Sequence, residues 1–454
     1  MTSSGSVHRT LGPVSGVRTS RGGAVARRQA TTSRPGEGDQ SSADDSTRRT
    51  EILRTAELLI ASSGLRTSLQ EIADAAGILP GSLYHHFESK EALLVELVLR
   101  YHADLDRIAA EGMQRLDERE PTVGFTEIAE LGSAIAVCAV THRSALQMSF
   151  YESASPNSEL AEVLARRPTA ILEAMLQTLR AARWSGYLRP DVDLPHLADR
   201  TCQTMLQVGL DVMRGDADPV QVATLLCRIL LEGIATGDLS DRRLDASPTF
   251  QAADAVVKSW GNDRDGLDDR QAHIRAVARA EFGRRGYEGT TIRDIAAAAG
   301  MGTGTVYRMI GSKDQLLASI MQEFGEKVGM GWTEVMRSGG SPVEKLDALS
   351  WVNTNALARF GDEFRIQLAW MRQSPPDTPN PGWLFATRLR QMKSLLTTGI
   401  RSGQIVISTP SREMLARCVI AVGWIPENML AEMGPRESLL HVRDTLLRGV
   451  VARR

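Results

Sequence analysis

The sequence predicts an all-α protein made of two tandem modules, each with a three-helix helix-turn-helix head followed by a helical body. Two observations lead to this prediction. A pattern of 28 residues occurs twice, at 67–94 and at 290–317, and the duplication makes each copy support the other. Strand signals are scarce: the β-branched run at 404–408 is the one short candidate, and we expect it to lie in a loop.

The repeat and the local composition divide the chain into six segments. We expect a disordered arginine-containing arm over 1–46, a first head over 47–106, a first body over 107–238, a linker over 239–266, a second head over 267–328 and a second body over 329–454. The linker is rich in Asp, Arg, Ser and Gly, with one short helix expected around 250–260.

The N-terminal arm is basic. Before its first acidic residue, Glu37, it contains Arg9, Arg18, Arg21, Arg27, Arg28 and Arg34. An arginine-bearing arm in front of a helix-turn-helix can enter a neighbouring minor groove of DNA. A solvated tail without a binding role is the alternative.

Each head begins with a capped helix and a glycine turn. The hydroxyls of Ser68 and Thr291 are placed to accept a backbone N–H at the start of the first short helix. Gly77 and Gly300 follow this helix, where the chain must turn sharply and a positive φ is favoured. These signals define helix-turn-helix segments over 68–87 and 291–310. A helical hairpin inside an ordinary α-bundle is the alternative, and the second copy of the pattern makes it improbable.

The second helix of each motif has one apolar and one polar face. Leu83 and Phe87, like Val306 and Ile310, are expected to be buried. The polar face can lie in a major groove, with its N-terminal residues near the base edges. The candidate DNA-binding residues are Ser68, Gly81, Ser82, Tyr84, His85, Lys90, Thr291, Thr303, Thr305, Tyr307, Arg308 and Lys313. Of these, Ser82, His85, Thr303, Thr305 and Arg308 are expected to lie over bases, and Tyr84, Lys90, Tyr307 and Lys313 to touch phosphates.

The charge is unevenly distributed between the two heads. The whole chain has a formal net charge of −2, which alone argues against general affinity for nucleic acid. From Arg48 to Lys90 there are five basic and five acidic residues, whereas Arg270 to Lys313 contains eight basic and three acidic. The second head is therefore the more basic of the two.

Both halves of the chain resemble the tetracycline-repressor (TetR) family of bacterial transcription regulators. Besides the paired helix-turn-helix patterns, the family's first helix is similar to RRTEILRTAELLIASSG (48–64) and RQAHIRAVARAEFGRRG (270–286). The resemblance implies a regulator that binds a double-stranded DNA operator. It also implies bodies that hold a small-molecule pocket and that pair through their last two long helices in a four-helix interface.

The tandem layout resembles actinobacterial two-module regulators of lipid-uptake and lipid-catabolism genes. The segment GILPGSLYHHF (77–87) is similar to that of single-module repressors of sterol degradation, whose effectors are acyl-CoA thioesters. This likeness implies a small hydrophobic or acyl-CoA-type effector. Aromatic candidates for its pocket are Tyr151 and Trp184 in the first body and Trp370 and Trp383 in the second, with an ordinary helical core as the alternative.

Duplication within one chain suggests an internal pseudo-dimer. Each body closes on a similar phrase, LLEGI at 230–234 and LLRGV at 446–450. A linker raises the effective concentration of one body near the other, which favours pairing within the chain. Because the two heads differ, such a unit would read two different half-sites. A homodimer with four heads is the competing arrangement.

The sequence offers no enzyme chemistry. It lacks a nucleophile elbow, a phosphate loop and a dinucleotide turn, and its Cys and His spacings suggest neither a metal site nor a cofactor. Neither a membrane-spanning run nor a signal peptide is evident, so we expect a cytoplasmic, nucleoid-associated bacterial protein. The predicted function is a ligand-releasable repressor of lipid or sterol genes. An effector-independent architectural DNA-binding protein is the alternative.

Overall fold

The computed structural model describes residues 37–65, 67–118, 122–148, 158–208, 217–237, 239–261, 269–373, 385–409 and 411–452. Within these ranges the chain contains helices and two isolated β-bridges, and no strand, which confirms the predicted all-α class. Residues 49–454 form one compact unit that contains both modules.

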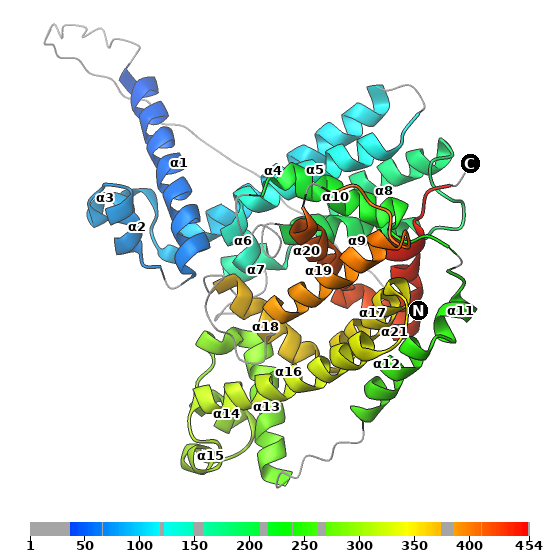
Figure 1. Ribbon diagram of the computed structural model, residues 1–454. Helices are drawn as coiled ribbons and strands as arrows, with labels where there is room; N and C mark the ends of the chain where they lie inside the picture. Colours follow the sequence, from blue (N-terminus) through cyan, green and yellow to red (C-terminus); the bar gives the residue numbers. More distant parts are fainter. Residues whose placement is uncertain are drawn as a thin grey trace, which may run out of the picture. The chain divides into compact units, whose positions relative to one another are not determined.

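The first module consists of ten helices in the described residues (Figure 1). Its head contains α1 (Glu37–Ser63), α2 (Leu69–Ala75), α3 (Pro80–His86) and the first part of α4 (Lys90–Glu118). Its body continues with α5 (Phe125–Thr141), α6 (Arg143–Met148), α7 (Glu159–Ala165), α8 (Thr169–Trp184), α9 (Leu194–Gln207) and α10 (Pro219–Glu232).

The second module repeats the order of the first. Two helices precede it, α11 (Asp241–Asp245) and α12 (Pro248–Ser259). Its head contains α13 (Asp269–Gly289), α14 (Ile292–Ala298), α15 (Thr303–Ile310) and the start of α16 (Lys313–Arg337). Its body contains α17 (Pro342–Arg359), α18 (Gly361–Gln373), α19 (Phe385–Arg401), α20 (Arg412–Val422), α21 (Glu427–Val442) and the π-helical η2 (Arg443–Arg448).

The duplication continues into the long helices that leave the heads. Buried positions recur in register along α4 and α16, for example Tyr101 with Phe324 and Leu105 with Val328. Both helices run past the expected head boundaries at 106 and 328, so head and body share one continuous helix in each module. A displacement of the body can therefore reach the head through a single rigid element.

The expected boundaries of the arm and the linker were partly wrong. The first helix begins at Glu37, inside the arm expected over 1–46, and residues 1–36 lie outside the described residues. The linker region is helical and packed, because its aromatic residues bury against the second body. The rings of Phe250 and Trp351 lie 5.6 Å apart, and those of Trp260 and Phe360 lie 5.3 Å apart. Residues 239–261 thus belong to the second body's fold.

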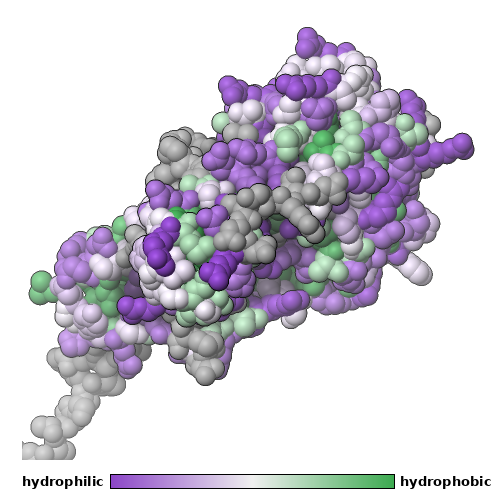
Figure 2. Space-filling view, turned by 90° about the horizontal axis from the view of Figure 1, so that it is seen from below, coloured by the Kyte–Doolittle hydropathy of each residue, from purple (hydrophilic) through white to green (hydrophobic). Residues whose placement is uncertain are grey.

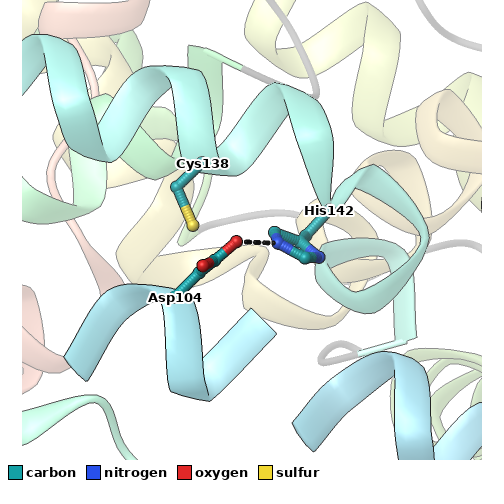
Figure 3. Close-up of side chains that lie close together, drawn as sticks. All are labelled: Asp104, Cys138 and His142. Carbon is teal, nitrogen blue, oxygen red and sulfur yellow. Dashed lines mark hydrogen bonds and ion pairs between the residues drawn. The ribbon is translucent and has the colours of Figure 1, made fainter. Parts of the chain in front are cut away.

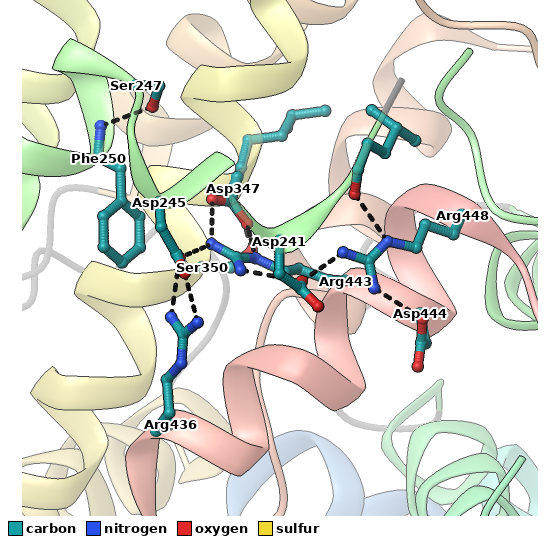
Figure 4. A network of polar contacts seen from close by, with 12 residues as sticks. Asp241, Asp245, Ser247, Phe250, Asp347, Ser350, Arg436, Arg443, Asp444 and Arg448 are labelled. Carbon is teal, nitrogen blue, oxygen red and sulfur yellow. Dashed lines mark hydrogen bonds and ion pairs between the residues drawn. The ribbon is translucent and has the colours of Figure 1, made fainter. Parts of the chain in front are cut away.

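A network of charged side chains fixes α11 to the second body (Figure 4). The fully buried guanidinium of Arg443 donates to Asp347 at 2.8 Å, to Asp245 at 2.7 Å and to Asp241 at 3.0 Å. Burial raises the pKa of the Asp347 carboxyl, and the bonded guanidinium acts in the opposite direction. Since a buried charge without a partner costs several kcal/mol, these groups hold one another in place.

The two similar closing phrases lie directly against each other. A Cβ on Gly449 would lie 2.2 Å from the Glu232 carbonyl oxygen, so the backbones touch where they cross. Backbone hydrogen bonds join each closing phrase and the residues after it to the other module, including the segments around Arg189 and Val406. These bonds come in pairs, and each member of a pair has its counterpart when the two modules are exchanged. The pairs are Val451 N to Leu231 O with Ala235 N to Leu447 O, Arg189 N to Val450 O with Val406 N to Ile234 O, and Ala452 N to Tyr187 O with Thr236 N to Gln404 O.

Polar side chains of α9 extend this contact between the bodies. Helix α10 packs against α20 and η2, and α9 lies beside α20 in Figure 1. The buried guanidinium of Arg200 donates to the Thr445 hydroxyl and to the Val422 carbonyl, and burial lowers the pKa of Arg200 to about 9. Asn428 donates to Asp199 at 2.7 Å. The interface is therefore close-packed and specific at its polar positions.

Candidate nucleic-acid interface

The N-termini of α2 and α14 have the predicted caps. The Ser68 hydroxyl accepts from the Glu71 amide at 3.2 Å, and the Glu71 carboxylate accepts from the Ser68 amide at 2.6 Å. Thr291 and Asp294 form the same reciprocal pair at 3.2 and 2.8 Å. Such a capping box satisfies two backbone donors that a helix start leaves unpaired, so it fixes where each motif begins.

The predicted turns are also present. Gly77 has a φ of +65° and Gly300 a φ of +66°. Beyond each glycine an amide donates back into the first helix, from Ile78 to Ala73 O at 3.0 Å and from Met301 to Ala296 O at 2.9 Å. These bonds have the pattern of a glycine-terminated helix end, and they set the angle at which the second helix leaves.

The second helix of each motif presents the expected faces. Leu83, Phe87 and Val306 are buried, and Ile310 is half-buried. Tyr84 is 55% exposed and Tyr307 is 52% exposed, so both rings are accessible on this face. The other polar-face candidates are exposed or half-buried: Gly81, Ser82, His85, Thr303, Thr305 and Arg308. Contact of this face with DNA remains a prediction.

The ammonium groups of Lys90 and Lys313, the expected phosphate contacts, donate to backbone carbonyls in the structure, and contact of either lysine with phosphate stays a prediction. The Lys313 ammonium donates to the carbonyls of Tyr287 and Thr290 at 2.8 and 2.9 Å, and it lies 4.0 Å from the centre of the Tyr287 ring. The Lys90 ammonium donates to the Leu65 carbonyl, and burial lowers its pKa. Lys90 therefore links the start of α4 to the chain that follows α1, and Lys313 links the start of α16 to the end of α13, because the carbonyls there need donors.

Several arginines that make the second head basic form ion pairs with acidic residues of the same chain. Arg275 pairs with Glu323, Arg279 with Glu363, and Arg285 with Glu281. Among the arginines of this head, Arg293 and Arg308 have exposed side chains on or next to the helix-turn-helix. These two are the best placed for an approaching phosphate or base.

Each head is attached to its own body through a carboxylate, half-buried in the first module and buried in the second, a feature that the sequence reasoning missed. In the first module Glu57 of α1 accepts from the Ser144 amide at 2.6 Å and from its hydroxyl. In the second, Arg279 at the matching position of α13 pairs with Glu363 of α18 at 3.1 Å. Burial raises the pKa of both carboxyls. The sequence alone shows that Glu57 and Arg279 occupy corresponding positions in the two modules. It does not show that their partners are Ser144 and Glu363.

The four aromatic pocket candidates are not brought together among the described residues. Trp184 ends α8 with 89% of its surface exposed, so its expected role in lining a pocket was wrong. Trp184 follows the buried stripe of α8 by two residues and therefore points outward. Tyr151 and Trp383 lie outside the described residues, as does the side chain of Trp370.

A cavity of about 190 Å³ lies inside the first body instead. It is bounded by α4, α6 and α9 and by the end of α7, and its polar lining residues include His102, Arg166, Gln203 and Gln207. Its main lining residues are Val98, Tyr101, His102, Leu146, Leu164 and Leu206. The sequence signal for this cavity was the aromatic pair Tyr101–His102 within the apolar stripe of α4.

Within the described residues no single helix is long and apolar enough to cross a membrane. The pair Arg412–Val422 and Glu427–Arg448 has the length and composition of a span only when the two helices are taken together, and they are bent by 82°. The face seen in Figure 2 is mainly hydrophilic, with hydrophobic residues in small separate areas. All four cysteines are buried thiols, and burial raises the pKa of Cys138, Cys227 and Cys418 to about 12.

Comparison with known proteins agrees with the geometry of the heads. The sequence profile of "Bacterial regulatory proteins, tetR family" matches twice, at 52–97 and 274–320. The HTH-type transcriptional repressor KstR2 of Rhodococcus jostii (strain RHA1) is 34% identical over 200 residues, which cover 42% of this chain and 92% of that protein. The HTH-type transcriptional regulator UidR of Escherichia coli (strain K12) is 30% identical over 150 residues, 32% of this chain and 71% of that protein.

One solved structure aligns with part of this chain at a low TM-score. The ketosteroid transcriptional regulator KstR2 of Mycobacterium tuberculosis covers 41% of this chain with 97% of its own length, at 18% sequence identity and a TM-score of 0.32. Both matches of the family profile fall on the two capped, glycine-turned motifs described above.

Proposed function

This chain belongs to the tetR family of bacterial regulatory proteins and is a DNA-binding transcriptional regulator, not an enzyme, and we propose that it is a repressor released by a small ligand. In this proposal the two heads of one chain occupy one asymmetric operator. We place the protein in the bacterial cytoplasm, beside the chromosome. The observation that carries the proposal is the direct pairing of the two bodies through their matched closing phrases.

The unlike outer faces support an asymmetric operator. Members of this family act as dimers on DNA, and a two-fold symmetric dimer imposes a palindrome. Here α3 offers Ser82 and His85 where α15 offers Thr305 and Arg308. Since the chain supplies two different faces, one chain would recognise two different half-sites, and no second copy would be needed.

The test is a footprint followed by stoichiometry. The DNA beside the gene is searched for a protected site, and the mass of the complex on that site is measured by light scattering. One chain of 49.5 kDa per site supports the proposal. A dimer of chains on two palindromes refutes the internal pseudo-dimer, and similar affinity for unrelated sequences with a steep salt dependence identifies an architectural DNA-binding protein instead.

Replacing half-sites sharpens this test. Two operators are made in which either half is duplicated, and a third in which the whole site is inverted. An internal pseudo-dimer tolerates the inversion, whereas each duplication places one head on the wrong bases. We expect a loss of about 1–3 kcal/mol per mismatched base pair. Equal binding to all three operators would show that one head does not read sequence.

The effector is proposed to bind in the cavity of the first body. Its walls are mostly apolar, and Arg166, which pairs with Asp106 at 2.7 Å, offers a cation near its rim. A space of about 190 Å³ suits the apolar part of a small acyl or sterol-derived ligand, with an acidic group directed to Arg166. Lipid or sterol metabolism as the regulated pathway follows from this ligand class and from the names of the relatives.

A thermal-shift screen with acyl-CoA thioesters tests the ligand class, since a ligand that prefers the folded state raises the melting temperature. The control is Leu206→Trp, which fills the cavity from α9. We expect the wild-type shift to disappear in this variant and its operator complex to become insensitive to the ligand. An unchanged shift in Leu206→Trp would place the effector elsewhere.

A further inference from the structure

Three potential metal ligands meet in the first body (Figure 3). Asp104 of α4, Cys138 of α5 and His142 at the end of α5 each offer one ligand atom, and these atoms lie within 4.8 Å of one another. The Nε2 atom of His142 is 2.7 Å from the Oδ2 atom of Asp104. The sequence suggested no such site, because Asp104 comes from a different helix.

The backbone holds these side chains in one place. Cys138 and His142 are four residues apart, so they lie on the same face of α5, one turn from each other. The His142 amide donates to the Cys138 carbonyl at 2.9 Å and ends the helix there. Helix α4 packs against α5 and brings Asp104 to this face. Two rigid helices therefore supply the three groups.

The second body lacks the same three groups at matching positions. When the buried positions of α4 are aligned with those of α16, Asp104 corresponds to Lys327. In the same alignment of α5 with α17, Cys138 corresponds to Ala356. Phe360 takes the place of His142, since its amide ends α17 by donating to Ala356 O at 2.8 Å. The fold thus accommodates this position without any of the three ligands, and the first body has all of them.

Exposure and neighbouring charge both matter for an incoming ion. The Asp104 side chain is 40% exposed, that of His142 is 12% exposed, and Cys138 is buried. An ion can therefore arrive on the Asp104 side and stop at the thiol. The guanidinium of Arg107 lies 3.4 Å from Asp104 Oδ1, and its positive charge repels an incoming metal ion. This side chain is more than half exposed, however, and also pairs with Glu111 at 2.7 Å.

We propose that Asp104, Cys138 and His142 form a Zn²⁺ site in the first body. Thiolate, imidazole and carboxylate are the protein ligands that zinc uses, at about 2.0–2.3 Å from the ion. Atoms bound to one tetrahedral ion at those distances are about 3.3–3.8 Å apart, so Oδ2 and Nε2 separate slightly and the sulfur moves inward. The ion replaces the hydrogen between Asp104 Oδ2 and His142 Nε2, so the neutral imidazole carries its proton on Nδ1, and the Cys138 thiol releases its proton to solvent.

Three protein ligands leave the fourth position of a tetrahedral zinc ion open. The site adjoins the cavity of the first body, since the ring of Tyr101, which lines that cavity, is 6.0 Å from the His142 ring. Zinc binding would tie α4, the helix that continues from the first head, to α5. The site itself does not depend on the proposed repressor function.

The test uses the full chain without an affinity tag, stripped of metal with a chelator. Zinc is added back and measured by elemental analysis after gel filtration, and Co²⁺ is used as a spectroscopic substitute. We expect one ion per chain and a thiolate-to-cobalt charge-transfer absorption. Cys138→Ala and His142→Phe install the residues of the second body, and we expect each to weaken zinc binding by more than about 100-fold, beyond the usual loss for an outer-sphere partner.

The matched control is Cys418→Ala, which removes a buried thiol from the second body. It should retain the cobalt absorption at full intensity. Circular dichroism checks that each variant is folded. Absence of the charge-transfer band in folded wild-type protein, or its persistence in Cys138→Ala, would overturn the proposal and leave a hydrogen-bonded Asp–His pair beside a thiol. Because the readout is spectroscopic, this result is independent of any failure in DNA binding.

Discussion

Lys313→Met separates two roles for the lysine that begins α16. A phosphate contact at this position would make DNA binding less salt-dependent when the lysine is removed, lowering the slope of log K against log salt by about 0.9. The structure instead places the ammonium on two carbonyls and on the ring of Tyr287. We therefore expect an unchanged slope and a less stable second head.

The size of the effect follows from the bonds that are lost. A hydrogen bond from a charged donor contributes about 1.5–3 kcal/mol, and an exposed cation–π contact about 0.5–1 kcal/mol. The ammonium is half-buried, and water can replace part of its bonding after substitution. A destabilisation of about 2–4 kcal/mol is expected for the junction at 287–290, with methionine preserving most of the aliphatic packing.

The assay has two arms. Hydrogen exchange reports the opening of the 286–299 region, and fluorescence anisotropy gives operator affinity from low to physiological salt. Lys90→Met is the matched control in the first head. Among the described residues its ammonium has one carbonyl partner, Leu65, so this variant should show a smaller loss of stability. If Lys313→Met lowers the slope of log K against log salt by about 0.9 and leaves hydrogen exchange unchanged, the structural role is refuted and Lys313 contacts a phosphate.

Three further predictions concern the recognition face, the interface and pH. Arg308→Ala should relax base preference by about 1–3 kcal/mol at one operator position, measured by competition with single-base variants; unchanged preference would mean that Arg308 does not read a base. Gly449→Ala should lower the free energy of unfolding in urea by more than about 3 kcal/mol, because its φ of +78° strains an alanine and the Cβ would meet Glu232 O at 2.2 Å. The control Gly186→Ala, with a φ of +74° and open space around the Cβ, should lose only the free energy of the backbone strain, and equal losses in the two variants would argue against the close crossing. Burial holds the pKa of His441 well below its usual range, so the folded state binds fewer protons than the unfolded one and stability falls as pH drops below about 6.5, by up to about 1.4 kcal/mol per pH unit; His441→Gln should reduce that fall, and an identical pH profile would exclude His441 as its source.

Much of each head could be predicted from sequence because its signals are local. The caps at Ser68 and Thr291 and the positive φ of Gly77 and Gly300 involve residues within a few positions of one another. The inner and outer faces of α3 follow from helical spacing alone. Duplication then identified the two modules, and the class of regulator followed from the paired motifs.

The partners of charged residues could not be predicted in the same way. Lys313 has the residue type and position of a phosphate contact, but its ammonium also donates to two carbonyls at the end of α13, more than twenty positions earlier. Trp184 has the residue type of a pocket wall, but the phase of α8 turns it outward. In both cases the deciding contact involves the packing of one helix on another.

The sequence by itself determined the helical class, the two modules and the position of each recognition helix, because these depend on spacing within one helix and its caps. Only the tertiary structure decided that the phrases around Gly233 and Gly449 touch, and that Asp104 reaches Cys138 and His142. Those arrangements join residues on separate helices. They are set by burial and by the pairing of buried polar groups across the whole fold, which no short stretch of sequence encodes.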